Sequence, residues 1–212
     1  MSTPIYKLYL MKPKLEAVSL PVEKQGEIMS LMMGWRGELG VRALIAGEVW
    51  SDERYLHFGV EWYPSWQVLR EYDHHLREIN WYNYIQSETF MGVEIPGMPP
   101  DLTPHKPGPE DKDGFYCVYI SQALPAAYAL TPDDEKRLAD FRALEGSLGI
   151  QTLMMINCRI GNEAWEYFGV QRYPSFEALE QHHAAQYQGQ WWKYLRARTY
   201  LCTAVDGELI QR

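Results

Sequence analysis

Residues 55–69 read YLHFGVEWYPSWQVL, and residues 165–179 read WEYFGVQRYPSFEAL. The second stretch repeats the first after 110 residues, and ten of the forty positions from residue 55 onward are identical. Two shorter matches precede it: IYKLYLM at 5–11 with FYCVYIS at 115–121, and GELGVRALI at 37–45 with GSLGIQTLM at 146–154. Because self-similarity at a fixed offset marks a repeated structural unit, the chain is predicted to be a tandem duplication.

A proline-rich stretch separates the two copies. Residues 96–114 hold six of the thirteen prolines. Proline fixes φ and removes a backbone donor, so this stretch is predicted to be an extended linker without helix or strand. The expected domains are therefore repeat 1 at residues 1–95, the linker at 96–114 and repeat 2 at 115–212.

The periodicity of apolar residues predicts the same order of elements in each copy. In copy one it indicates strands at 5–11, 41–49, 54–62 and 89–95, and helices at 21–35 and from Pro64 to about residue 86. In copy two the second helix is expected to break or bend near Gly189. Pro64 and Pro174 are assigned to the first turn of the second helix. The order βαββαβ is typical of a ferredoxin-like unit, and it places the chain in the α+β class. Because the strands are apolar on both faces, the two sheets are predicted to pack together as an intrachain α/β barrel.

The segment YPSFEALEQHHAAQYQGQWWKYL at 173–195 carries a family resemblance. It is similar to the dimeric α/β-barrel superfamily, particularly its antibiotic-biosynthesis-monooxygenase-like and NIPSNAP-like members, with Leu179 and His182 on the shared helix pattern. Copy one departs from that pattern, because Tyr72 stands at the position of His182. The resemblance implies a fold but no single reaction, since the superfamily includes cofactor-independent monooxygenases, isomerases, haem enzymes such as the chlorite dismutases, and non-catalytic proteins.

Composition restricts the partners. A formal charge of −8 over 212 residues argues against nucleic-acid and anionic-membrane surfaces, which need clustered cations. We expect a cytoplasmic protein that binds a small apolar or aromatic molecule, with a homo-oligomer left open and no cofactor assigned. The three cysteines are far apart in sequence and form no metal-binding motif, so they are expected to be buried thiols and no metal site is predicted.

Candidate site residues come from polar and aromatic side chains in the repeated segments. The predicted catalytic residues are His182, Tyr173 and Arg159. A histidine suits proton transfer near neutral pH, and an arginine can hold an anionic oxygen. The predicted ligand-binding residues are His75, Tyr63, Glu48 and Trp191. A structural alternative is open for each group: buried histidines bonded within the core, an ion pair between Glu48 and Arg159, and aromatic packing at Trp191.

The expected pocket lies in the C-terminal half, between the second sheet and the helix at 174–195. His182 and Tyr173 are predicted to line it, while Tyr72 and Trp66 fill the matching space in copy one. If the repeated motif has a function, the hydroxyl groups of Tyr63 and Tyr173 are expected at the mouths of two pockets. The glycine of the repeated Phe-Gly-Val is expected to make room for a helix. Three functions stay open: a cofactor-independent monooxygenase or isomerase, a non-catalytic ligand-binding or assembly protein, and a haem enzyme with His182 or His183 as the axial ligand.

Overall fold

The computed structural model describes residues 3–98, 114–159 and 162–204, so most of the proline-rich linker predicted at 96–114 lies outside the described residues. The first half contains β1 (Ile5–Pro13), α1 (Leu15–Val18), α2 (Val22–Leu39), β2 (Arg42–Val49), β3 (His57–Tyr63), α3 (Trp66–Glu78), α4 (Trp81–Tyr84) and β4 (Ile85–Glu94). The second half contains β5 (Phe115–Ala123), the short 3₁₀ helix η2 (Pro125–Tyr128), α5 (Pro132–Ser147), β6 (Gln151–Asn157), β7 (Tyr167–Tyr173), α6 (Phe176–Gln188), η3 (Trp191–Lys193) and β8 (Leu195–Ala204).

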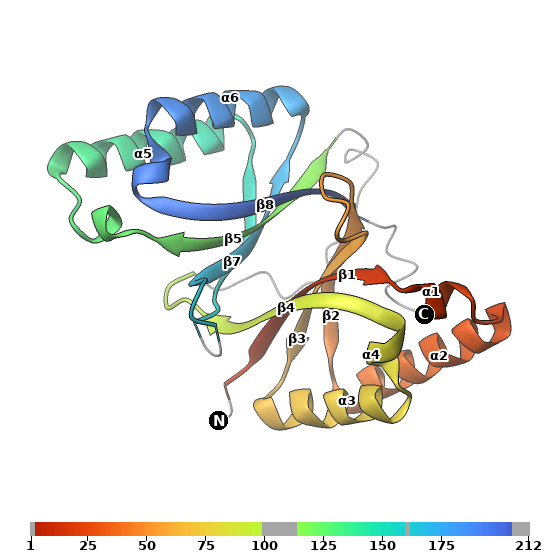
Figure 1. Ribbon diagram of the computed structural model, residues 1–212. Helices are drawn as coiled ribbons and strands as arrows, with labels where there is room; N and C mark the ends of the chain where they lie inside the picture. Colours follow the sequence, from red (N-terminus) through yellow and green to blue (C-terminus); the bar gives the residue numbers. More distant parts are fainter. Residues whose placement is uncertain (1–2, 99–113, 160–161, 205–212) are drawn as a thin grey trace.

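Eight antiparallel strands form one sheet in the order β1-β3-β2-β8-β5-β7-β6-β4, which returns to β1 as a closed barrel (Figure 1). Each half contributes four neighbouring strands. The halves join at two seams, where Glu48 of β2 faces Thr203 of β8, and Val93 of β4 faces Asn157 of β6. The α+β class predicted from the sequence is confirmed.

The strands bury alternate side chains inside the sheet, as a pleated strand requires. Tyr6, Leu8 and Leu10 of β1 and Val118 and Ile120 of β5 belong to one buried cluster that draws on both halves. The helices lie on the outer face of the sheet, with α2 and α3 over the first half and α5 and α6 over the second (Figure 1). Each half therefore has a second layer of contacts between its helices and its strands.

Serine, not proline, starts the second helix of each copy. Ser65 accepts a hydrogen bond from the backbone N–H of Val68 and caps α3, while Ser175 does the same for α6, so Pro64 and Pro174 lie before the cap and outside the first turn. The assignment of the prolines to the first turn was therefore wrong.

The predicted long helix to residue 86 is also wrong. It ends at Glu78, because Asn80 adopts a left-handed conformation at φ 55° before the short α4. In the second copy the break predicted near Gly189 is confirmed: α6 ends at Gln188 with Gly189 as its C-cap, and Gln190 follows at φ 54°.

The glycine of the repeated Phe-Gly-Val lies against a tyrosine ring, not against a helix. Gly59 faces Tyr9 across the β1–β3 pair, and a Cβ at residue 59 would lie 2.2 Å from the hydroxyl oxygen of Tyr9. Gly169 and Tyr119 repeat this arrangement in the second half. The glycine therefore lets an aromatic side chain cross the outer face of the sheet, which explains why the motif occurs twice.

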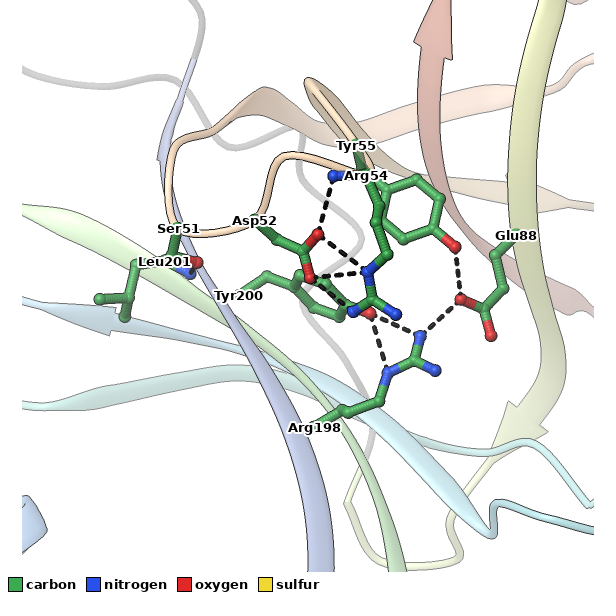
Figure 2. A network of polar contacts seen from close by, with 8 residues as sticks. All are labelled: Ser51, Asp52, Arg54, Tyr55, Glu88, Arg198, Tyr200 and Leu201. Atoms are coloured by element: carbon green, nitrogen blue, oxygen red, sulfur yellow. Dashed lines mark hydrogen bonds and ion pairs between the residues drawn. The ribbon is translucent and has the colours of Figure 1, made fainter.

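A polar network links the two halves at one end of the barrel (Figure 2). Arg198 of β8 pairs with Glu88 of β4 at 2.5 Å, and the hydroxyl group of Tyr55 donates to the same carboxylate at 2.8 Å. β4 and β8 hold opposite places in the closed strand order. The pair thus joins strands of different halves that are not neighbours in the sheet.

Candidate functional site

A cavity of about 350 Å³ lies between the outer face of the first four strands and helices α2, α3 and α4. We call it the N-terminal cavity. Its lining is Lys7, Tyr9, Met11, Met29, Met32, Arg36, Ala43, Ala46, Gly47, Glu48, His57, Phe58, Glu61, Tyr72, Leu76, Trp81, Tyr82, Ile85, Ser87 and Thr89. A mostly apolar pocket of this size with a few polar groups is typical of small-molecule sites.

A buried ion pair forms part of its wall. The guanidinium group of Arg36, on α2, bonds the carboxylate of Glu61, on β3, and the hydroxyl group of Tyr63 donates to that carboxylate as well. Burial alone would raise the pKa of Glu61, but the charges of Arg36 and Lys7 and the hydrogen bonds outweigh it and hold this pKa below its ordinary value. Glu61 is therefore ionised at neutral pH, although its side chain is only 3% exposed.

Two polar atoms beside this pair have no hydrogen-bond partner among the described residues. They are Nε of Arg36 and the hydroxyl oxygen of Tyr72, and both are buried. Burial, followed by the negative charge of Glu61, raises the pKa of Tyr72 well above its ordinary range, so the phenol keeps its proton. Burial likewise raises the pKa of Tyr9, to about 12. A third such atom among the described residues, Nε1 of Trp62, belongs to a side chain that does not line this cavity. The Arg36 side chain acts on both phenols in the opposite direction and lowers their pKa values, though by less than burial raises them.

The second copy carries different chemistry at the equivalent positions. By the repeat, Arg36 corresponds to Glu145, Glu61 to Gln171, Tyr63 to Tyr173 and Tyr72 to His182. In the second copy Nδ1 of His182 lies 2.8 Å from the hydroxyl oxygen of Tyr173, and Nε2 lies 3.0 Å from a carboxylate oxygen of Glu145. The carboxylate accepts, so Nε2 carries the proton and Nδ1 accepts from the phenol. Both ring nitrogens of His182 are engaged.

Side-chain size explains why the cavity lies in the first copy. Ala46 faces the repeat glycine Gly59 across the β2–β3 pair, whereas Met155 faces Gly169 in the second copy. Likewise Met32 lines the cavity, while the corresponding Phe141 stacks on the ring of His182 at 4.8 Å. Larger side chains occupy the matching region of copy two.

A larger hollow of about 500 Å³ lies beside α5 and α6, lined by residues that include Asp134, Phe141, Trp191 and Tyr194. We call it the α5–α6 hollow. The acidic group at its centre is already paired: Asp134 accepts from the backbone and hydroxyl of Thr131, and from the hydroxyl of Tyr194 at 2.7 Å. No buried ion pair comparable to Arg36–Glu61 lies among the described residues of its wall. We therefore take the N-terminal cavity as the candidate site.

The structure separates the residues that the sequence predicted as one site. His182 and Tyr173 contact each other but are 2% exposed and line neither cavity. Arg159 lies just after β6 and pairs with Glu166 and Tyr128, so the predicted Glu48–Arg159 ion pair is wrong.

The predicted ligand-binding residues are also dispersed. Glu48 lines the N-terminal cavity and Trp191 the α5–α6 hollow. Tyr63 is fully buried, so neither it nor Tyr173 stands at a pocket mouth, and His75 stacks on Trp35 at 4.7 Å.

The expected position of the pocket was wrong as well. Tyr72 lines an open cavity in the first half and does not fill it. Arg36, Glu61 and Ala46 were not predicted from the sequence. One signal was available: Glu61 is a charged residue on the same strand face as Gly59 and Tyr63, where a helix must cover it.

No group of three or more histidine, cysteine, aspartate or glutamate side chains in the described parts of the chain could hold a metal ion. The three cysteines are buried free thiols, as expected. Within residues 3–98, 114–159 and 162–204, no helix is long and apolar enough to cross a membrane.

No protein-family profile matches the sequence, and no curated protein is similar to it in sequence. Solved structures do share the fold. A chlorite dismutase from Candidatus Nitrospira defluvii aligns with a TM-score of 0.74 at 10% identity, over 99% of this chain and 94% of that one. A haem-binding protein from Thermus thermophilus aligns with a TM-score of 0.70 at 13% identity, over 100% and 94%. At such identities the likeness shows the fold alone.

Proposed function

We propose that this protein is a tandem pair of ferredoxin-like units that binds a small apolar or aromatic molecule in the N-terminal cavity. The observation that carries the proposal is the lining of that cavity: methionine, phenylalanine, leucine and tryptophan side chains surround one buried ion pair, Arg36–Glu61. Apolar walls supply the affinity for such a ligand, and a few fixed polar groups supply its orientation.

A size change in the wall tests the proposal. Ala46→Met gives copy one the residue that copy two has at this place, so it should fill the cavity without adding a charge. We expect the fluorescent apolar probe N-phenyl-1-naphthylamine to bind the wild type and to bind Ala46→Met roughly tenfold more weakly or worse, because the new side chain clashes with it.

The matched control is Met155→Ala, which makes the reverse change in copy two and should leave the affinity of the probe unchanged. Equal binding by the wild type and Ala46→Met, with both folded by circular dichroism, would contradict the assignment of the site.

The haem alternative draws on the structural neighbours, which include a haem-binding protein. The axial ligands expected for it do not fit. Both ring nitrogens of His182 are engaged by Tyr173 and Glu145, and His183 lies exposed and lines neither cavity. We therefore expect no Soret band from a histidine-ligated haem after the protein is incubated with hemin and desalted. A sharp Soret band that His182→Ala abolishes would restore the haem proposal.

Catalysis by a cofactor-independent monooxygenase or isomerase is a second proposal. Its support is the chain Tyr173–His182–Glu145, in which a histidine is hydrogen-bonded to a phenol and to a carboxylate. His182 is 2% exposed and lines neither cavity, so this proposal needs a substrate path other than the N-terminal cavity. Arg159, also predicted to be catalytic, lies in the separate contact with Glu166. The test is His182→Ala: turnover that persists in this variant would remove the histidine from any reaction found.

A further inference from the structure

A second cavity, of about 320 Å³, adjoins the N-terminal cavity next to α1 and α4. We call it the α1 cavity. Its own lining includes Pro13 at the end of β1, Ala17 of α1 and Ile28 of α2. The two cavities meet along a wall of five residues that line both: Met11, Met29, His57, Trp81 and Ile85.

This shared wall is adaptable. Two of its side chains belong to methionines, Met11 and Met29, and Met29 is 47% exposed. A methionine side chain is unbranched and has three rotatable bonds, so it changes shape to suit what lies beside it. A narrow, flexible ligand can therefore extend from one cavity into the other.

The second copy has the outer space without the inner one. By the repeat, Ala17 corresponds to Ala127, which lines the α5–α6 hollow. The inner region of copy two is occupied by the larger side chains of Met155 and Phe141. Copy one therefore has, next to the counterpart of this hollow, an inner space that copy two has filled.

Lys7 marks the other end of the N-terminal cavity. It also lines a broad, open hollow over β4 and α3, together with the exposed residues Ser87 and Thr89, so a group bound beside Lys7 stays in contact with water. The negative charge of Glu48 is away from this end, because Glu48 faces His57 across the β2–β3 pair. The charge next to the open hollow is therefore positive.

The carboxylates near Lys7 already have other partners. Glu61 pairs with Arg36, and Asp73 pairs with Arg77 at 2.7 Å. Lys7 acts on these two carboxylates only through its charge, since its ammonium group makes no hydrogen bond or ion pair within the described residues. A carboxylate on a ligand can form a charge-assisted hydrogen bond with it.

Strand β1 runs along both cavities and gives the length of the joined space. Lys7, Tyr9 and Met11 line the N-terminal cavity, while Met11 and Pro13 line the α1 cavity. At about 3.4 Å per residue, Lys7 to Met11 spans about 14 Å and Lys7 to Pro13 about 20 Å. An extended carbon chain advances about 1.25 Å per atom, given a C–C bond of about 1.5 Å. The N-terminal cavity alone therefore takes about 11 carbons, and the joined space about 16.

We propose, building on the ligand-binding function proposed above, that the ligand is a long-chain carboxylate of about 16 carbons. Its carboxylate pairs with Lys7 beside the open hollow. Its chain follows β1 through the N-terminal cavity and passes Met11 and Met29 into the α1 cavity.

A series of saturated carboxylates tests the length of the site. The affinities of decanoate, dodecanoate, tetradecanoate and hexadecanoate are measured by displacement of N-phenyl-1-naphthylamine, below the concentrations at which they form micelles. We expect the affinity to rise at each step up to hexadecanoate, by up to about fourfold per buried methylene. An affinity that stops rising at dodecanoate would overturn the joined site.

Ala17→Phe tests the α1 cavity, because it adds a ring to a wall that only this cavity has. We expect hexadecanoate to bind the variant roughly tenfold more weakly, and decanoate to bind it as it binds the wild type, which also shows that the variant is folded. The matched control is Ala127→Phe, the same change in copy two, which should leave both affinities unchanged. Undiminished hexadecanoate binding by Ala17→Phe would overturn the proposal.

Lys7→Met tests the position of the carboxylate. It should weaken the binding of dodecanoate by about tenfold, as expected for one hydrogen bond between charged groups, and leave the binding of 1-dodecanol unchanged. The control is Lys12→Met, on the same strand, because Lys12 lines neither cavity. Equal losses for dodecanoate and 1-dodecanol, or no loss for either, would overturn the role of Lys7.

The failure of this inference is distinguishable from the failure of the proposed function. Ala46→Met should weaken the binding of every chain length, because it fills the N-terminal cavity. If it does so while Ala17→Phe has no effect on hexadecanoate, the ligand ends in the N-terminal cavity and only the joined site fails. If Ala46→Met weakens the binding of none of the chains, the proposed function itself fails.

Discussion

Exchanging the charges of Glu88 and Arg198 should leave the protein nearly as stable as the wild type, whereas either reversal alone should destabilise it. These two residues are 110 positions apart, so they occupy the same place in the two copies, and they pair with each other across the barrel. The neighbours of the two side chains differ: the hydroxyl group of Tyr55 donates to Glu88, whereas Arg198 donates to the hydroxyl group of Tyr200 at 2.9 Å. The exchanged pair therefore cannot match the wild type completely. The repeat brings equivalent positions together, and opposite charges stabilise their contact.

The expected size follows from the exposure of the pair. The two side chains are 32% and 31% exposed, so water screens the interaction and the pair contributes about 1 kcal/mol, near the upper end for surface ion pairs. A single reversal replaces attraction by repulsion of similar size, for a loss of about 2 kcal/mol. For a chain of this length that loss lowers the melting temperature by roughly 4–8 °C. The double reversal should lie within about 3 °C of the wild type.

Thermal unfolding of Glu88→Arg, Arg198→Glu and the double variant, followed by circular dichroism, completes a double-mutant cycle. The coupling should shrink in high salt, because screening weakens both the attraction and the repulsion. The same cycle on Lys24 and Glu27, whose side chains are 54% and 63% exposed, provides a control with little coupling. A double reversal whose loss equals the sum of the single losses would refute the argument that the two positions act on each other.

Three further predictions concern the wall of the cavity and the caps. Glu61→Gln should destabilise the protein by about 3 kcal/mol at pH 7, because it leaves Arg36 buried without a counter-ion. Folding lowers the pKa of Glu61, so the ionised carboxylate stabilises the folded protein above the ordinary carboxyl pKa. This stabilisation is lost as the pH falls through the pKa that Glu61 has in the folded protein. The free energy of unfolding of the variant, measured with denaturant, should therefore depend less on pH below about pH 4.3. Gly59→Ala should cost about 1–3 kcal/mol in the same assay and weaken probe binding, because its Cβ meets the ring of Tyr9; unchanged stability would contradict that packing. Ser175→Ala should cost about 1 kcal/mol through the lost cap, and a Thr replacement at this position should retain most of it.

The fold class could be predicted because the internal repeat and the spacing of apolar residues can both be read directly from the sequence. Gly189 likewise marked the end of α6, but the end of α3 could not be predicted. The sequence NWYNYI at 80–85 is compatible with a continuing helix and with a turn. In the structure Asn80 adopts positive φ, which ends the helix before the short α4 and strand β4. The position of Pro64 relative to the helix was mispredicted because the next residue, Ser65, is the N-cap. Its side chain accepts a hydrogen bond from the backbone N–H of Val68, which a proline side chain cannot do.

The candidate site was harder to predict, because its residues become neighbours only through the sheet register and the helix packing. Arg36 and Glu61 come from α2 and β3, and no spacing in the sequence links them. The sequence favoured the second copy because of its histidine. In the structure that histidine is held on both sides by protein groups, which is the arrangement of a satisfied core residue.

The divergence of the two copies supports a division of labour between them. Copy two pairs Glu145 with His182 and satisfies the ring of that histidine completely. Copy one has Arg36 and Tyr72 at those positions, and both side chains line a cavity. The buried polar cluster of copy two is closed by its own hydrogen bonds, whereas that of copy one borders open space. This difference favours the first copy as the binding half and the second copy as its scaffold.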